Sequence, residues 1–322
     1  MRKKVLFPVI AAVIVAGVIL VYLLVLKPRE TDRPVRMAYQ AIVVNLPAYV
    51  AEEQNLFGSR KVEVEHTEMS SSNDILNAVI AGQIDIVPSL SVFPVLHLGI
   101  QNPGVVRVFG IGYMKQDNAV DSIIVKQDSP INSLAGLAGK KVGLFPGTTA
   151  PNLLQALLKR EGVDASSVTV VPLPPPAQVG SLASGAIDAL FSMEPITTIA
   201  MSRGGFRTVY GSVYASFLDP VPMGVGVISR RFEREYPKLA KRAIEALLAG
   251  GQFVIDQPNE ARKLLPTYVK IPPPVAAKVH LVAVEAVVEE NIEALQMFIE
   301  ILHEIGELPK TLDAKELVAL GK

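Results

Sequence analysis

The sequence predicts an α/β protein with two similar lobes, each built around a parallel sheet. Extended apolar segments alternate with helical segments over residues 35–100, and the same alternation returns over residues 141–203. A short motif repeats with it, because residues 81–86 read Ala-Gly-Gln-Ile-Asp-Ile and residues 184–189 read Ser-Gly-Ala-Ile-Asp-Ala. Strands joined by helices pair in parallel through right-handed crossovers. Each half is therefore expected to form one doubly wound sheet.

The two halves are expected to contain the same elements in the same order. In the first half the strands are expected at residues 35–40, 62–66 and 84–87, and the helices at 47–54, 74–81 and 92–100. In the second half the strands are expected at 141–144, 168–171 and 187–191, and the helices at 150–160, 177–184 and 195–203. Gly82 and Gly185 are expected to end equivalent helices, because glycine readily adopts the left-handed conformation found there.

The remaining segments suggest how the halves are joined. Residues 121–126 and 223–229 are extended and are the candidates for two strands that connect the lobes. Beyond Arg230 the sequence turns helical, and no further strand is expected. Helices are expected at 238–253 and 259–265, followed by a long stretch at 275–305, all packing back onto the first lobe. The expected division is an N-terminal segment 1–30, a first lobe of 35–118 and 222–322, and a second lobe of 119–221.

The N-terminal segment has the pattern of a membrane-spanning or signal helix. Arg2, Lys3 and Lys4 precede an uncharged apolar run from Val5 to Leu26. As a helix this run would be roughly 33 Å long, enough to cross the bilayer core. The run has no small-x-small cleavage pattern at its end, so an uncleaved anchor is favoured over a cleaved signal peptide. The basic cluster favours a cytoplasmic N-terminus, which places the lobes in the periplasm or on the outer face of the cytoplasmic membrane.

The composition excludes several classes of function. Lys plus Arg equals Asp plus Glu, 31 each, so no basic field indicates nucleic-acid binding. The absence of cysteine removes disulfides, thiolate metal sites and cysteine nucleophiles. The 4 histidines form no close pair, and no metalloprotease, serine-hydrolase or phosphate-loop motif is present. We expect a protein that is not an enzyme and that needs no cofactor or metal.

Polar side chains follow the predicted strands, where doubly wound sheets bind their ligands. The most informative stretch is residues 142–151, in which a buried strand ends at Gly147 and a helix restarts behind two threonines. Such a turn directs backbone N–H groups and the positive end of a helix dipole toward an anion. The predicted ligand-binding residues are Asn45, Ser70, Ser71, Ser72, Ser89, Ser91, Thr148, Thr149 and Glu194.

Two alternatives stay open for these residues. Asn45, Ser72, Ser91 and Thr149 are also ordinary helix-capping residues, whereas Ser71 and Thr148 are not needed as caps and are better candidates for direct contact. Glu194 would repel a free anion and suit a ligand with an N–H donor, or it interacts only with the start of its own helix.

An aromatic wall for a heterocycle would have to come from Tyr39, Tyr49, Phe93 or Tyr113, because the chain has no tryptophan.

Several motifs in the same order resemble the nitrate/sulfonate/taurine-type solute-binding proteins of ABC importers, a family that includes binders of the thiamine pyrimidine precursor. The resemblance lies in residues 45–57, in the two repeated motifs, in residues 128–142, in Gly147-Thr148-Thr149 and in Glu194-Pro195, and it covers about residues 35–265.

The resemblance implies the type 2 periplasmic-binding-protein fold, with two lobes, two hinge strands and a cleft that closes over one small solute. It also implies delivery of that solute to an ABC permease. We expect a small oxyanion such as nitrate, a sulfonate or taurine. The alternatives are a thiamine pyrimidine precursor or another heterocycle, a membrane-anchored ligand sensor, or an enzyme on the same fold.

Overall fold

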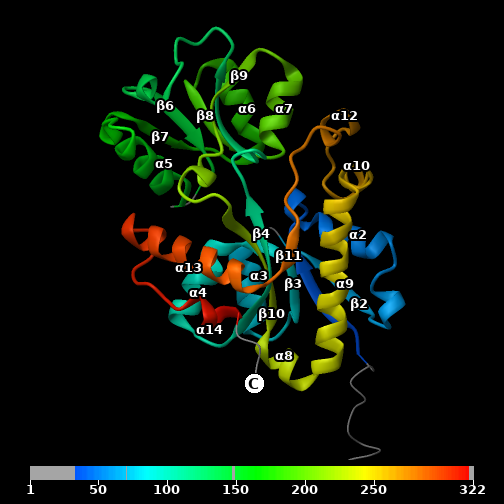
Figure 1. Ribbon diagram of the computed structural model, residues 1–322. Coiled ribbons are helices and arrows are strands. Elements are labelled where there is room, and N and C mark those ends of the chain that lie inside the picture. The colour runs from blue at the N-terminus through cyan, green and yellow to red at the C-terminus, as the bar shows by residue number, and fades with distance from the viewer. Residues whose placement is uncertain (1–32, 70, 147–148, 319–322) are drawn as a thin grey trace, which may run out of the picture.

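Two β-sheets stacked end to end organise the molecule (Figure 1). The computed structural model describes residues 33–69, 71–146 and 149–318. The expected N-terminal anchor lies outside these residues. Within them, no helix has both the length and the hydropathy needed to cross a bilayer.

The first sheet has six strands in the order β11-β4-β10-β3-β1-β2. Its strands are β1 (Val35–Tyr39), β2 (Val64–Glu68), β3 (Ile86–Ser91), β4 (Val106–Met114), β10 (Val221–Ser229) and β11 (Val284–Ala286). β1 pairs in parallel with β2 and β3, whereas β10 is antiparallel to β3 and β4.

The second sheet has five strands in the order β7-β6-β8-β5-β9. Its strands are β5 (Asp121–Lys126), β6 (Lys141–Leu144), β7 (Thr169–Pro172), β8 (Ala189–Met193) and β9 (Phe206–Gly211). β6 pairs in parallel with β7 and β8, whereas β5 is antiparallel to β8 and β9. The order β2-β1-β3-β10-β4 in the first sheet therefore has the same pattern as β7-β6-β8-β5-β9 in the second.

The repeated sequence motif has the same role in both halves. Asp85 accepts a hydrogen bond from the backbone N–H of Arg36 at 3.0 Å, and Asp188 accepts one from the backbone N–H of Lys141 at 2.8 Å. Each aspartate thereby fixes the start of the neighbouring parallel strand. Gly82 and Gly185 have φ values of 72° and 78°, as expected for glycines that end helices.

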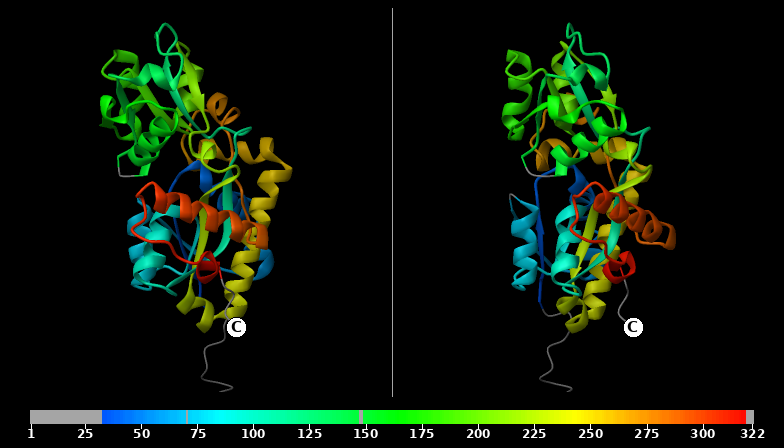
Figure 2. Two further views of the ribbon diagram at one scale, coloured as in Figure 1. Left: turned by 60° about the vertical axis from the view of Figure 1, so that its left-hand side comes forward. Right: turned by 90° about the vertical axis from the view of Figure 1, so that its left-hand side faces the viewer.

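Helices cover both faces of the first sheet (Figures 1 and 2). The N-terminal helices are α2 (Leu46–Glu53), α3 (Ser72–Ile80) and α4 (Val92–Gln101). The helices that follow β10 are α8 (Arg230–Glu235), α9 (Pro237–Asp256), α10 (Pro258–Arg262), α11 (Leu265–Tyr268), α12 (Pro273–Ala276), α13 (Glu289–Glu304) and α14 (Ala314–Val318). In the second lobe, α5 (Thr149–Arg160), α6 (Pro175–Ser184) and α7 (Ile196–Arg203) pack on the second sheet.

Two expectations were wrong. The sheets are mixed, because β10 in the first sheet and β5 in the second return antiparallel after the chain changes lobes, and β11 is also antiparallel to its neighbour β4. A strand does occur beyond Arg230, since β11 pairs with β4. The stretch 275–305 does contain helices, as expected, with β11 lying between α12 and α13.

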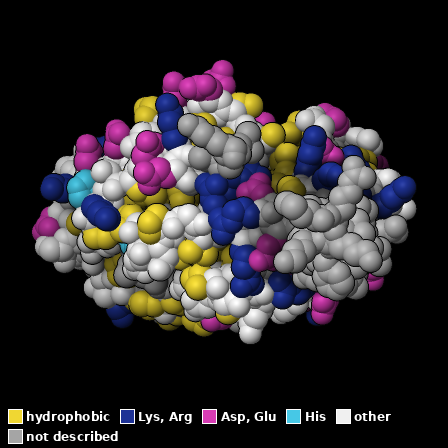
Figure 3. All heavy atoms as spheres, turned by 90° about the horizontal axis from the view of Figure 1, so that it is seen from below, with side chains coloured by type: hydrophobic (Ala, Val, Ile, Leu, Met, Phe, Trp, Pro, Cys, Tyr) yellow, Lys and Arg dark blue, Asp and Glu magenta, His cyan; other side chains and the backbone are white. Residues whose placement is uncertain are grey.

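The chain crosses between the lobes over residues 115–120 and 212–220, just before β5 and β10. The segments expected as connecting strands thus lie inside the two sheets. Figure 3 views the end of the first lobe that lies away from the second lobe, which we call the base.

Candidate functional site

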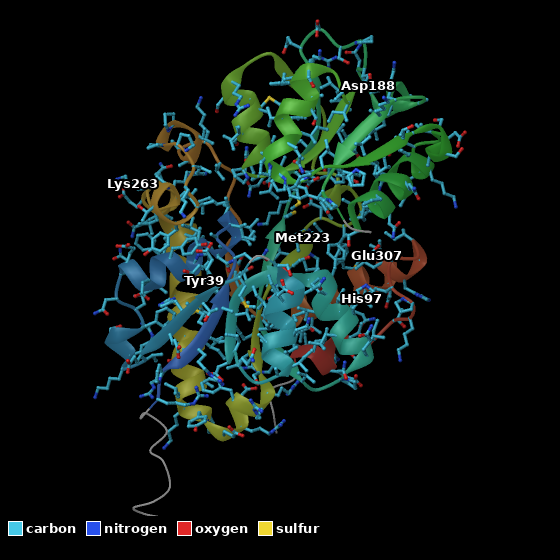
Figure 4. The ribbon with its side chains drawn as sticks, turned by 180° about the vertical axis from the view of Figure 1, so that it is seen from behind. Tyr39, His97, Asp188, Met223, Lys263 and Glu307 are labelled. Carbon is cyan, nitrogen blue, oxygen red and sulfur yellow. The ribbon has the colours of Figure 1, made fainter. Side chains whose placement is uncertain are left out.

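A cavity of about 360 Å³ lies between the lobes, next to the two chain crossings. It is lined by Gln40, Ile42, Val44, Ser71, Ser72, Asn73, Leu90, Ser91, Phe93 and Pro94 of the first lobe. It is also lined by Phe145, Pro146, Thr149, Ala150, Met193 and Tyr214 from the second lobe and its crossing, and by Met114, Met223, Gly224 and Val282. Figure 4 shows Met223 between the two lobes.

The N-termini of three helices meet at this cavity. α3 begins at Ser72, α4 begins at Val92 after Ser91, and α5 begins at Thr149, and residues of all three starts line the cavity. Helix N-termini carry backbone N–H groups without intrahelical acceptors and the positive end of the helix dipole. Because α3 and α4 belong to one lobe and α5 to the other, an anion here can be held from both sides.

The polar lining consists of neutral groups. Ser71 caps α3, so the expectation that it is not needed as a cap was wrong. Its hydroxyl oxygen accepts from the backbone N–H of Asp74 at 3.1 Å, and its hydroxyl donates to Oδ2 of Asp74 at 2.7 Å. The Ser72 hydroxyl donates to Oε1 of Gln40 at 2.9 Å. Ser91 stands before α4 without a side-chain capping bond, so its hydroxyl is not used by its own helix. Among the described residues that line the cavity, none is Lys, Arg, Asp, Glu or His.

The rest of the lining is apolar and flexible. Met114, Met193 and Met223 contribute thioether side chains, and Phe93 and Phe145 contribute rings. Methionine adapts its shape to irregular apolar ligands. The cavity therefore combines neutral hydrogen-bond donors at helix starts with an apolar wall, which suits an anionic head group with an uncharged tail.

Thr149 also connects the lobes directly. Its hydroxyl donates to Oε1 of Glu307 at 2.8 Å, and the side-chain amide of Asn152 donates to Oε2 of Glu307 at 2.6 Å. Glu307 is 7% exposed and follows α13, which packs on the first lobe (Figure 4). A buried carboxylate of one lobe therefore holds the first turn of α5 in the other.

The structure brings four of the predicted residues together at the cavity: Ser71, Ser72, Ser91 and Thr149. Ser70 and Thr148 lie outside the described residues. Asn45 and Ser89 are fully buried beside the cavity rather than among its lining residues. The Asn45 amide donates to the backbone oxygen of Gln40 at 2.9 Å, so it supports a residue that does line the cavity.

Glu194 faces a different cleft. Its carboxylate accepts from the hydroxyl of Thr198 at 2.7 Å, one turn along α7, and this cleft is also lined by Lys278 and His280. Burial raises the pKa of Glu194, and its hydrogen bonds with Thr198 oppose that shift. This geometry corresponds to the second of the two alternatives, an interaction with its own helix.

Sequence reasoning missed several lining residues. Gln40 directly follows β1 and Asn73 follows two predicted serines, so position alone could have indicated both. Phe145 directly follows β6, and Tyr214 lies on a chain crossing that the sequence did not place. Of the four candidates for an aromatic wall, Phe93 lines the cavity, whereas Tyr39 and Tyr49 line a small separate one with His66.

Comparison with known proteins agrees with this architecture. Over 196 residues the chain is 24% identical to an Escherichia coli (strain K12) protein named as binding aliphatic sulfonates, with 60% of each chain covered. The match thus spans less than two thirds of that relative. Over 246 residues the chain is 27% identical to the taurine-binding periplasmic protein of the same organism, covering 71% of this chain and 74% of that one.

Solved structures share the fold at low sequence identity. The periplasmic aliphatic sulphonate binding protein SsuA from Escherichia coli superposes with a TM-score of 0.75 at 20% identity, covering 89% of this chain and 97% of that one. The desulfurization enzyme DSZB superposes with a TM-score of 0.69 at 17% identity, covering 88% and 96%. The two-lobed α/β fold is therefore that of periplasmic binding proteins, and it is shared by an enzyme. The model of the NMT1/THI5-like family matches residues 44–261, more than half of the chain, and the chain belongs to this family.

Proposed function

We propose that the protein is the extracytoplasmic solute-binding component of an ABC importer for a small organic sulfonate. One observation carries this proposal: three helix N-termini from two lobes converge on an interlobe cavity, and the part of its lining that the structure describes contains no charged side chain. Neutral donors and helix dipoles can bind a sulfonate's three oxygens without a buried countercharge. The sulfonate- and taurine-binding relatives support the same solute class.

The lining favours an alkyl or aryl tail over an amino group. Taurine carries an ammonium group, and the cavity has no carboxylate among its lining residues to receive it. Burying that group without a partner would cost binding energy. Methionine and phenylalanine side chains would instead contact a hydrocarbon tail.

The partners follow from this assignment. The solute would be released to an ABC permease, with the lobes in the periplasm or on the outer face of the cytoplasmic membrane and the N-terminal segment as anchor. The division at residues 118–119 and 221–222 would separate the two lobes that close on the solute.

We infer binding rather than catalysis, although the fold also serves an enzyme. None of the residues lining the cavity is a histidine, carboxylate or lysine that could act as a general base for its serines and threonine. A cysteine nucleophile is excluded by composition.

Titration calorimetry with butanesulfonate, taurine, nitrate and an aminopyrimidine tests the proposal. We expect saturable binding of butanesulfonate without turnover, and binding of taurine at least about tenfold weaker because of its unpaired ammonium group. Binding of the aminopyrimidine alone would replace the sulfonate assignment, and conversion of any of these compounds would replace the transport assignment.

A matched pair of variants tests the site itself. Ser72→Ala removes the hydroxyl that orients Gln40 at the start of α3, and we expect butanesulfonate to bind about 5- to 30-fold more weakly. Ser184→Ala, at the exposed end of α6, serves as the control. Equal affinities of both variants and the unmodified protein would rule out this site.

A further inference from the structure

The base of the first lobe carries a groove with an apolar floor and a basic rim. The groove has a volume of about 1010 Å³. Phe109, Ile244, Ile292 and Val318 contribute to its floor. Its charged lining residues are Arg107, Arg230, Arg234, Lys241 and Lys315 against Glu233, Glu245 and Glu289.

The positive charges of the groove are only partly neutralised. Arg107 is paired with Glu233 at 2.9 Å. Arg230 donates to the backbone oxygens of Val106 at 3.3 Å and Glu316 at 3.0 Å, and no carboxylate lies within ion-pair distance of it among the described residues. Burial lowers the pKa of Arg230, with Arg107 and Arg234 acting in the same direction and Glu233 against them. An anion would relieve this crowding of guanidinium groups.

Other cations on the rim are exposed. Arg234 and Lys315 are exposed and have no carboxylate within ion-pair distance in the part of the chain that the structure describes. Lys241 is also exposed and lies 3.9 Å from the carboxylate of Glu245. Arg231 is exposed on the same short helix and donates to the backbone oxygen of Gly82 at 3.1 Å. Figure 3 shows lysine and arginine side chains gathered in the middle of the base.

The described chain begins at the same end of the lobe. Arg33 stacks over the rings of Phe232 in α8 and Tyr236 directly after it, with its guanidinium carbon 4.8 and 4.6 Å from the ring centroids. The apolar run of the sequence ends at Leu26. The intervening chain can span at most about 25 Å even when fully extended, so a bilayer that holds the run must lie close to the base.

We propose that the basic groove at the base binds anionic phospholipid headgroups of the membrane in which residues 5–26 would be held, an inference that rests on the N-terminal anchor of the proposed function. Guanidinium and ammonium groups of the rim pair with lipid phosphates, and the apolar floor contacts the lipid below the headgroup. This contact fixes the first lobe upright on the membrane, with the interlobe cavity at the far end of that lobe from the lipid. The partner is the bilayer itself rather than a soluble anion.

The full chain, reconstituted in vesicles, provides the test. Because the chain has no cysteine, Asn102→Cys at the exposed end of α4 gives a single labelling site near the base. Energy transfer from this label to acceptor dyes on lipid headgroups reports how often the base is docked. We expect higher transfer in vesicles with phosphatidylglycerol than in pure phosphatidylcholine, and a loss of the difference at about 0.5 M salt.

Two neutralised variants decide whether the groove is responsible. Arg234→Gln, Lys241→Gln and Lys315→Gln together should lower the docked-to-undocked ratio by about fivefold for each cation removed. Lys141→Gln, Lys159→Gln and Arg203→Gln remove the same charge from the exposed surface of the second lobe and should leave the ratio unchanged. Equal transfer in both vesicle types, or equal effects of both triple variants, would overturn the proposal. Repeating the energy-transfer measurement with inorganic phosphate at millimolar concentration distinguishes lipid from a free anion. If free phosphate at that concentration abolishes the difference between the two vesicle types, the groove is a site for a soluble anion and the proposal is overturned.

Discussion

Asp121 is a buried acid at the point where both chain crossings meet. It is fully buried, its backbone oxygen accepts from the N–H of Ser212 at 2.9 Å, and its Oδ2 accepts from the N–H of Tyr214 at 3.4 Å. Its Oδ1 has no hydrogen-bond partner among the described residues. Burial raises the pKa of Asp121 to about 7, and the backbone N–H groups only partly oppose this shift.

This raised pKa predicts how stability changes with pH. The folded protein keeps the Asp121 proton up to about pH 7, whereas the unfolded chain loses it near pH 4. The folded state therefore binds more protons between these values, and stability falls as the pH rises from about 4 to 7. Asp121→Asn stays neutral, so we expect it to raise the free energy of unfolding at pH 8 by about 1–3 kcal/mol and to flatten the slope below pH 7.

Chemical denaturation across pH 4–8 checks this expectation. Asp117→Asn, at an exposed position on the same crossing, is the matched control and should follow the unmodified protein. An unchanged pH slope in the Asp121 variant would show that the carboxyl group is not responsible for it.

The sequence predicted those site residues whose position follows directly from a strand end. Ser71, Ser72, Ser91 and Thr149 are of this kind, because each lies next to the start of a helix that follows a strand. Tyr214 could not be predicted, since it enters the cavity from a crossing whose path depends on how the two lobes stack, and Met223 could not because the pairing of β10 was not foreseen. Glu194 follows a strand as well, but its side chain bonds within its own helix, and local sequence does not determine that orientation.

The packing of α9 against α2 depends on a single missing side chain. A Cβ at Gly250 would lie 2.1 Å from the backbone oxygen of Pro47 and 3.3 Å from the backbone nitrogen of Ala51. The two helices approach so closely because no side chain separates them at that point. From the sequence alone, Gly250 is a residue of low helix propensity inside an amphipathic helix. Its role in packing is visible only once the partner helix is known.

Gly250→Ala is expected to destabilise the protein by about 2 kcal/mol or more. The helix would gain up to about 1 kcal/mol from the better helix former, but the methyl group would have to push two backbones apart. Gly180→Ala in α6 is the control, because a Cβ there meets nothing within 4 Å. That variant should be neutral or stabilised by about 0.5–1 kcal/mol. Thermal or urea unfolding of both proteins compares them, and equal stability would contradict the packing argument.

Strand prediction failed where a strand is short or where its pairing is non-local. β11 has three residues and lies against β4 at Gly110 and Gly112, where a Cβ would come within 3 Å of the β11 segment. β5 and β10 were recognised as extended, but their antiparallel pairing was not, because it results from the chain changing lobes twice. Periodicity indicates that a segment is extended and does not indicate which strand it pairs with.

The arrangement of the two lobes depends on contacts on both sides of the cavity. On one side the two chain crossings join the lobes covalently. Elsewhere Glu307 bridges from the first lobe to Thr149 and Asn152 in the first turn of α5. Thr149 also lines the cavity, so the contact that holds the lobes together includes a residue of the candidate binding site. A hinge-closing receptor needs such a contact to be weak enough to open.

Glu307→Ala is expected to shift the ligand-free protein toward a more open arrangement. The substitution removes two hydrogen bonds to a carboxylate and leaves their donors in α5 unpaired, at a cost of about 1–3 kcal/mol to the closed arrangement. Electron paramagnetic resonance distances between spin labels at Ser166→Cys in the second lobe and Asn102→Cys in the first would report it, and the absence of native cysteine makes the labelling specific. Glu304→Ala, an exposed residue one turn earlier on α13, is the control.

We expect longer and broader distances between the two labels only in the Glu307 variant. At saturating sulfonate the short distance should be recovered, because the ligand would bind both lobes and replace the lost bridge. Identical distances in both variants would mean that the two crossings alone set the lobe arrangement. If the Glu307 variant binds sulfonate as tightly as the unmodified protein while its short distance is recovered, lobe closure and ligand binding are independent.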